Sequence, residues 1–230
     1  MNQSMNLQSP NPNPARRGFT LIEMLVVIAI IVLIAGMVIP LAGLAAKKKK
    51  IAQAQAELKV IELAIDQYHN KKGFYPPDNT NSAGQNQLFY ELLGPRATVD
   101  PGGGPTIYTN NFSGRDTIDT PTITAVFSAG GIVNSSPDPT QLQNFIPNLS
   151  PSLVKQFAVG ANTNLWVFGC PSAGPASAIL NGPAGPVNPI RYNSSNPTNN
   201  PNTYDLWVDI IIGGVTNRIS NWSTDPQVVP

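Results

Sequence analysis

The chain has few of the residues, such as cysteine and histidine, from which enzyme active sites and metal sites are usually built. Its 230 residues contain one cysteine, Cys170, and one histidine, His69. A single cysteine excludes an internal disulfide, and one histidine leaves no cluster of zinc-type ligands. Only 12% of the residues are charged and the formal net charge is +1, which argues against a general nucleic-acid binder. We therefore expect no enzyme, no nucleic-acid partner, an inert Cys170 and a solvated His69.

The residues that are present are unevenly distributed along the chain. Residues 1–18 are polar, whereas 19–46 are almost wholly apolar and could cross a bilayer as one helix at about 1.5 Å per residue. Residues 47–72 are charged with helical periodicity. From residue 73 to 230 the chain is rich in Gly, Pro, Asn, Ser and Thr. These shifts predict a leader, a membrane-spanning helix, its amphipathic continuation and an extracytoplasmic domain.

The stretch "RRGFTLIEMLVVIAII", residues 16–31, joins a basic pair to a glycine, an aromatic residue, a single carboxylate and an apolar run. A cleaved secretory signal would have a shorter apolar core than this one, and a plain anchor fits the length but gives no reason for the carboxylate of Glu23. The stretch closely resembles the N-terminal signal of type IV pilins and of the pseudopilins of type II secretion. The resemblance implies that prepilin peptidase cuts on the cytoplasmic side between Gly18 and Phe19. Phe19 is then N-methylated, and the apolar helix stays in the mature protein.

Cleavage would leave the new α-amino group of Phe19 near the carboxylate of Glu23. Each charge is expensive to desolvate alone, and the pair less so. In the family, the glutamate attracts the amine of a neighbouring subunit during assembly. A negative charge near a helix N-terminus is also favourable without any such role. Further along, Pro40 removes the hydrogen bond to the carbonyl of Gly36, so we expect the helix to soften between them, a harmless kink being the alternative.

The lysine run at 47–50 conflicts with the orientation that the signal requires. The positive-inside rule alone puts this run in the cytoplasm, because only Arg16 and Arg17 precede the span. The cleavage chemistry needs Gly18 in the cytoplasm, and we give it precedence. The lysines would then meet lipid headgroups outside the inner membrane, acidic neighbours in a filament, or only water.

The second half of the chain predicts a helix packed on a sheet. Apolar residues recur every three or four positions up to a helix end at Gly73, at Ile51, Ala54, Leu58, Ile61, Ile65 and Tyr68. Strand-like composition occurs at 122–127, 164–169, 190–193 and 203–214, the last followed by a turn at Gly213–Gly214 and a final edge strand. Without βαβ alternation the sheet is expected to be antiparallel, giving an α+β, pilin-like domain. Residues 100–187 are expected to be a loop-rich insertion, and Trp166, Trp207 and Trp222 to pack in the sheet.

Three further stretches narrow the resemblance to the major pseudopilin of type II secretion. They are "IELAIDQYHNKKGFYPPDN" at 61–79 and the "YDLW" and "ISNW" segments at 204–207 and 219–222. Such proteins usually carry an acidic calcium-binding loop between the last two segments. Calcium needs six to eight oxygen ligands, and this chain offers Asp209 and Asn217 there, so we expect no cofactor and no metal, with calcium left as the open alternative.

The resemblance implies a bacterial inner-membrane protein whose single-pass helix leaves the C-terminal domain in the periplasm. Its expected partners are other copies of itself, other pseudopilins, prepilin peptidase, the inner-membrane assembly platform and membrane lipids. A type IV pilin or minor pilin for adhesion, motility or DNA uptake is an alternative, disfavoured because such pilins commonly close a C-terminal disulfide. A membrane-tethered binding domain that never polymerises is the other alternative.

Overall fold

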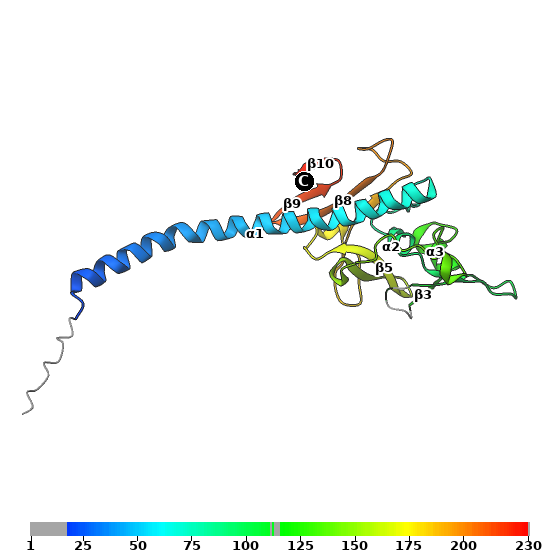
Figure 1. The fold of residues 1–230 in the computed structure, drawn as a ribbon, viewed down its shortest axis with the longest axis horizontal. Helices are drawn as coiled ribbons and strands as arrows, with labels where there is room; N and C mark the ends of the chain where they lie inside the picture. Colours follow the sequence, from blue (N-terminus) through cyan, green and yellow to red (C-terminus); the bar gives the residue numbers. More distant parts are fainter. Residues whose placement is uncertain (1–17, 111, 113–115, 230) are drawn as a thin grey trace, which may run out of the picture. The chain divides into compact units, whose positions relative to one another are not determined.

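The computed structural model describes residues 18–110, 112 and 116–229, without the side chains of 38–42. The predicted leader, with Arg16 and Arg17, therefore lies outside the described residues except for Gly18. The chain divides into two compact units, Met1–Ala45 and Ala46–Pro230. Helix α1, Leu21–Lys72, contributes to both and runs from blue to cyan in Figure 1.

The part of α1 in the second unit carries the predicted apolar stripe. Ala54, Ile61, Ile65 and Tyr68 are fully buried and Leu58 is nearly so. The helix ends where predicted, because Gly73 adopts φ +83° and donates its N–H to the carbonyl of His69 at 2.8 Å. A left-handed residue at this position closes the last turn, and glycine adopts it without a steric penalty.

The main sheet has the order β10-β9-β8-β7 and is antiparallel throughout, as predicted. Its strands are β7 Arg191–Asn193, β8 Asp205–Ile212, β9 Val215–Ser220 and β10 Ser223–Val229. Gly213 and Gly214 have φ of +60° and +82°, which suits the two-residue turn between β8 and β9. The expectation that the strand after this turn is the edge was wrong, because β10 pairs with β9 and forms the edge itself.

One short stretch connects the main sheet to a second one. β6 Asn188–Pro189 pairs with β5 Asn162–Cys170, which pairs in turn with β4 Val154–Val159. The chain continues from β6 into β7, which begins at Arg191 and pairs with β8 of the main sheet. Between them the N–H of Ile190 reaches the carbonyl of Phe168 at 2.8 Å, so backbone hydrogen bonding runs on from β5 to β8.

Alternate residues of β8 share one core with the buried stripe of α1. Leu206, Val208 and Ile210 belong to the same cluster of buried side chains as Ile61 and Ile65. Figure 1 shows β8 and β9 beside the cyan part of α1. The predicted α+β class, an N-terminal helix followed by a C-terminal antiparallel sheet, is confirmed.

Residues 100–187 contain more regular structure than the expected loops. Besides β4 and β5, the region holds strands β2 Ile107–Thr109 and β3 Thr117–Asp119, which form a small sheet with β1 Arg96–Thr98. It also contains helix α3, Thr120–Phe127, so the predicted strand at 122–127 was wrong. The Asp119 side chain caps this helix by accepting the N–H of Thr122 at 3.0 Å, and Pro121 lies in its first turn. A capping aspartate and an early proline outweigh the strand-like β-branched residues that follow.

Trp166 and Trp207 lie in β5 and β8, as predicted, whereas Trp222 lies in the turn between β9 and β10. Trp166 stacks on Phe89, with ring centroids 6.0 Å apart, and donates its indole N–H to Asp116 at 3.0 Å. Trp207 and Trp222 meet edge to face at 5.8 Å. Phe89 lies in helix α2, Leu88–Leu93, all of whose residues are buried.

Candidate functional site

The candidate site is the start of α1, where the predicted cleavage and methylation positions lie. Gly18 and Phe19 are exposed and precede the helix, and 78% of the Phe19 surface is accessible. A Cβ atom added at Gly18 would meet no other atom within 4 Å. The described chain therefore leaves the Gly18–Phe19 peptide bond accessible, and its own packing does not require glycine there.

At the first turn of α1, the side chains of Thr20 and Glu23 each accept a hydrogen bond from the backbone N–H of the other residue. The Thr20 hydroxyl oxygen accepts the N–H of Glu23 at 3.3 Å, and Glu23 Oε2 accepts the N–H of Thr20 at 2.7 Å. The Thr20 hydroxyl also donates to Glu23 Oε2 at 2.8 Å. This is a capping box, in which two backbone N–H groups that no helical carbonyl can reach are satisfied by side chains.

The capping box fixes where the Glu23 carboxylate lies. It is folded back onto the N–H of Thr20, the residue that directly follows Phe19. A favourable charge at the helix start was predicted from the sequence, but these hydrogen bonds were missed, although the spacing Thr-x-x-Glu signals them. Both hydrogen bonds that Thr20 donates to Glu23 go to Oε2. Among the described residues, Glu23 Oε1 accepts no hydrogen bond.

The apolar part of α1 that follows is unburied. Its large side chains from Leu21 to Met37 expose between 45% and 84% of their surface. Among the residues that the structure describes, no helix is both long enough and apolar enough to span a membrane. The helix includes Gly36 and Pro40 without interruption, and the softening expected between them stays a prediction.

Asp209, the carboxylate considered for calcium, and Asp205, at the start of the same strand, both have protein partners. Asp209 accepts hydrogen bonds from Arg218 Nε at 2.8 Å and Nη2 at 3.0 Å, and Arg191 Nη1 lies 3.6 Å from its Oδ2. Asp205 accepts the backbone N–H groups of residues 198, 199 and 200 at 2.8 to 3.0 Å. These contacts give both side chains a structural role, and the expectation of no cofactor stays untested.

The single cysteine and histidine also pack within the domain. Cys170 is 4% exposed, and burial raises the pKa of its thiol to about 11, which keeps it protonated and unreactive. His69 is half-buried rather than fully solvated, because its ring stacks on Tyr75 at 4.2 Å.

Comparison with known proteins bears on the N-terminal segment. Residues 13–39 match the family model described as the prokaryotic N-terminal methylation motif. The match supports a type IV pilin-like protein made as a precursor, and such proteins are structural subunits rather than enzymes. No curated protein and no solved structure matches the chain.

Proposed function

We propose that the chain is a structural subunit of a type II secretion pseudopilus. It is made as a prepilin, cut between Gly18 and Phe19, methylated on Phe19 and polymerised through its N-terminal helix to aid protein export across the outer membrane. The observation that carries the proposal is the methylation motif at 13–39, together with an accessible Gly18–Phe19 bond at the start of a helix.

Before assembly, the apolar helix anchors the subunit in the inner membrane, with the domain from residue 73 onward in the periplasm. The exposed apolar side chains of 21–37 support this step, because such a surface needs lipid or other helices to cover it. On assembly, the same surface exchanges lipid for the helices of neighbouring subunits.

Glu23 supplies the polar contact that sets the register of this exchange. One of its oxygens is engaged by Thr20, and Oε1 accepts no hydrogen bond among the described residues. Oε1 can therefore receive the methylated amine of an adjacent subunit while the capping box stays intact. A charged amine and a carboxylate that meet in an apolar bundle stabilise each other far more than either is stabilised alone.

A pseudopilin is favoured over a surface pilin by the cysteine content. The chain has one cysteine, and it is buried, so it cannot close the C-terminal disulfide that type IV pilins commonly carry. A pilin or minor pilin for adhesion, motility or DNA uptake is the second candidate, and a tethered domain that does not polymerise is the third.

The test compares Glu23→Leu and Glu23→Gln with the wild type in cells that assemble filaments. Both variants are expected to be processed and to accumulate in the membrane, yet to yield at least tenfold less sheared filament. Glu57→Gln, a change to a carboxylate in the second unit, serves as the control and should assemble normally. Normal assembly of Glu23→Leu would refute the role given to Glu23, and a wild type that never forms filaments would favour the tethered domain.

A further inference from the structure

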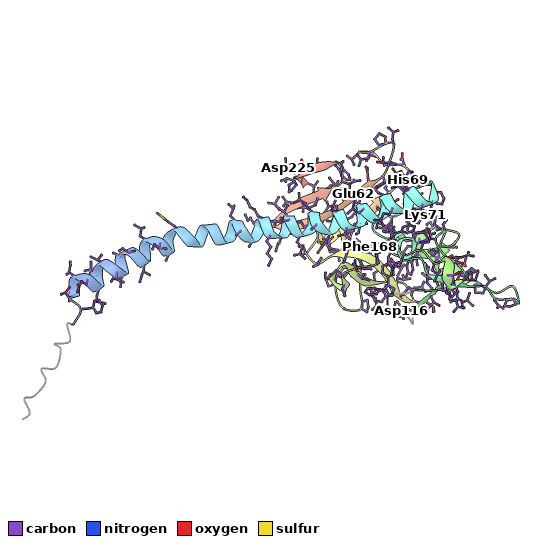
Figure 2. The ribbon with its side chains drawn as sticks, in the orientation of Figure 1. Glu62, His69, Lys71, Asp116, Phe168 and Asp225 are labelled. Carbon is purple, nitrogen blue, oxygen red and sulfur yellow. The ribbon has the colours of Figure 1, made fainter. Side chains whose placement is uncertain are left out.

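A groove outside the N-terminal site lies between strand β4 and the segment 171–187, which leads from β5 to β6. Its volume of about 960 Å³ is within the range of small-molecule sites. β5 and β8 complete the lining with Trp166, Cys170 and Ile211. Figure 2 labels Phe168, which lies in β5 midway between the first two of these residues. All lining residues belong to the second unit, so one compact part of the chain forms the groove.

Small, uncharged residues form one wall of the groove. Three Gly, four Ala and four Pro make up 11 of the 17 residues in the segment 171–187, and none of the 17 is charged. Such short side chains leave space between the segment and the sheet instead of filling it. The backbone of the segment approaches β4 at Gly182, where an added Cβ atom would lie 2.5 Å from the carbonyl oxygen of Gln156. Glycine therefore allows this contact, which a larger residue would disrupt.

Hydrogen bonds from three strands hold the segment 171–187 in place. The donors lie on β8, β7 and β4, and each reaches a backbone carbonyl of the segment: Ile211 N–H to Ala173 at 2.8 Å, Arg191 Nη2 to Ala178 at 3.0 Å and Ala158 N–H to Asn181 at 2.8 Å. Within the segment, Leu180 and Val187 exchange two backbone hydrogen bonds at 2.8 and 2.9 Å. The groove is therefore preformed, and a ligand that enters it does not have to order a loose loop.

Lys155, on β4, gives the groove its charge. Among the described residues that line the groove, no other is charged. None of the ion pairs among the described residues involves Lys155, so its ammonium has no carboxylate partner there. Its stem lies against Gly169 of β5, where an added Cβ atom would be 2.6 Å from Lys155 Cγ. The groove thus combines a half-buried, uncompensated positive charge with an otherwise neutral lining.

We propose that this groove binds a small molecule that has an apolar body and one carboxylate. The body packs on apolar residues such as Trp166, Ile179 and Ile211, and the carboxylate pairs with the Lys155 ammonium. An uncharged ligand would desolvate the ammonium without giving it a partner, and a cation would be repelled. A preformed groove of this size, with an apolar lining and few polar groups, is typical of small-molecule sites. The site adds a ligand-binding role to the domain and does not depend on the proposed assembly through α1.

The direct test is a titration of the full-length protein in phosphatidylcholine nanodiscs, which cover its apolar helix, with two matched probes. The probe 2-naphthoate has a carboxylate on an apolar ring system, and 2-naphthamide has nearly the same shape without the charge. Binding is followed by NMR of the methyl groups of three alanines that line the groove, Ala173, Ala176 and Ala184. Naphthoate should shift these signals saturably, with a Kd of about 1 mM or lower, and naphthamide should bind about tenfold more weakly.

Two variants separate the charge of the groove from its shape. Lys155→Met keeps the stem and removes the ammonium, so naphthoate should bind about tenfold more weakly while the affinity for naphthamide stays the same. Ala184→Trp fills the groove from an exposed position, without disturbing the core, and should abolish binding of both probes. The control Lys71→Met removes an exposed lysine near the end of α1, where Figure 2 shows it, and should leave both affinities unchanged.

Three results would overturn the proposal. Equal affinities for naphthoate and naphthamide, or an unchanged affinity of Lys155→Met for naphthoate, would mean that the ammonium does not select the ligand. Signals that do not shift, or that shift in proportion to the probe without saturating, would mean that the groove is not a binding site. Shifts that persist in Ala184→Trp would place the binding elsewhere. The titration needs no filament, so its failure would leave the proposed function untouched, and a subunit that never polymerises could still bind the probe.

Discussion

Replacing Glu91 by glutamine should destabilise the domain, because this buried carboxylate ties three segments together. Glu91 is fully buried on α2. Its Oε1 accepts the N–H of Val133 at 2.8 Å and the side chain of Gln87 at 3.3 Å. Its Oε2 accepts the N–H of Asn134 at 2.9 Å and the hydroxyl of Tyr68, on α1, at 3.1 Å.

The size of the expected loss of stability follows from the four hydrogen-bond donors that contact the two carboxylate oxygens of Glu91. A glutamine amide has one oxygen, so in either orientation its NH₂ group faces a backbone N–H of the 133–134 segment. A buried donor left without a partner costs about 1–3 kcal/mol, and a hydrogen bond to a charged group contributes about 1.5–3 kcal/mol. Removing a buried charge returns part of this, since burial opposes the ionised form. We expect Glu91→Gln to lose about 2 kcal/mol and Glu91→Leu about 4 kcal/mol.

The assay is urea unfolding of the full chain in mild detergent, followed by tryptophan fluorescence at pH 8. Tyr68→Phe, which removes one of the four donors, is the matched control and should lose about 1 kcal/mol. A Glu91→Gln variant as stable as the wild type would refute the reasoning, because it would mean that desolvation of the carboxylate cancels its hydrogen bonds.

The same variant gives a pH dependence of known sign. Burial raises the pKa of Glu91, against the opposing effect of the N–H groups of Val133 and Asn134. The folded pKa therefore exceeds the unfolded value, and the stability gained from proton binding is present at low pH and lost as the pH rises through the folded pKa. The deficit of Glu91→Gln should be largest in acid and narrow as the pH rises.

Three further substitutions probe the β8 carboxylate, the first turn of α1 and the end of that helix. Burial opposes ionisation of Asp205, but the N–H groups of 198–200 outweigh this effect and lower its pKa. Asp205→Asn should therefore reduce the free energy of unfolding in urea by about 1–3 kcal/mol at pH 7. The difference from the wild type should shrink as the pH falls below 3.8. Thr20→Val removes the helix cap, and the Glu23 amide should exchange with deuterium about fivefold faster, unless the capping box is absent in solution. Gly73→Ala places a Cβ at φ +83° and should cost about 1 kcal/mol, whereas an unchanged stability would contradict the left-handed helix end.

Elements with a long periodic pattern could be predicted from the sequence. The stripe from Ile51 to Tyr68 covers five turns, and only a helix buries those positions together. β8 was predictable because its apolar residues are bounded by the turn at 213–214.

Short helices and strands could not be predicted from the periodicity of apolar residues. Strands β1, β2 and β3 have three residues each, too few to show a period. At 122–127 the β-branched composition favoured a strand, and the deciding signals, Asp119 and Pro121, lie outside that window.

For the candidate site, the sequence motif indicates positions, whereas the hydrogen bonds around them come from the structure. The assignments of Gly18, Phe19 and Glu23 rest on a motif of fixed spacing, and they stay predictions. The capping box was readable as Thr-x-x-Glu and was missed. The pairing of Asp209 with Arg218 depends on the register between β8 and β9, which no local pattern reveals.

The central claim is that the chain is processed as a pilin, and mass spectrometry of the intact protein and its N-terminal peptide tests it most directly. The protein should be purified from membranes of cells that contain prepilin peptidase, with Gly18→Leu as the control that blocks cleavage. The account predicts a chain that begins at Phe19 and carries one additional methyl group on its α-amine. A chain that retains residues 1–18, or one cut after the apolar run, would contradict it.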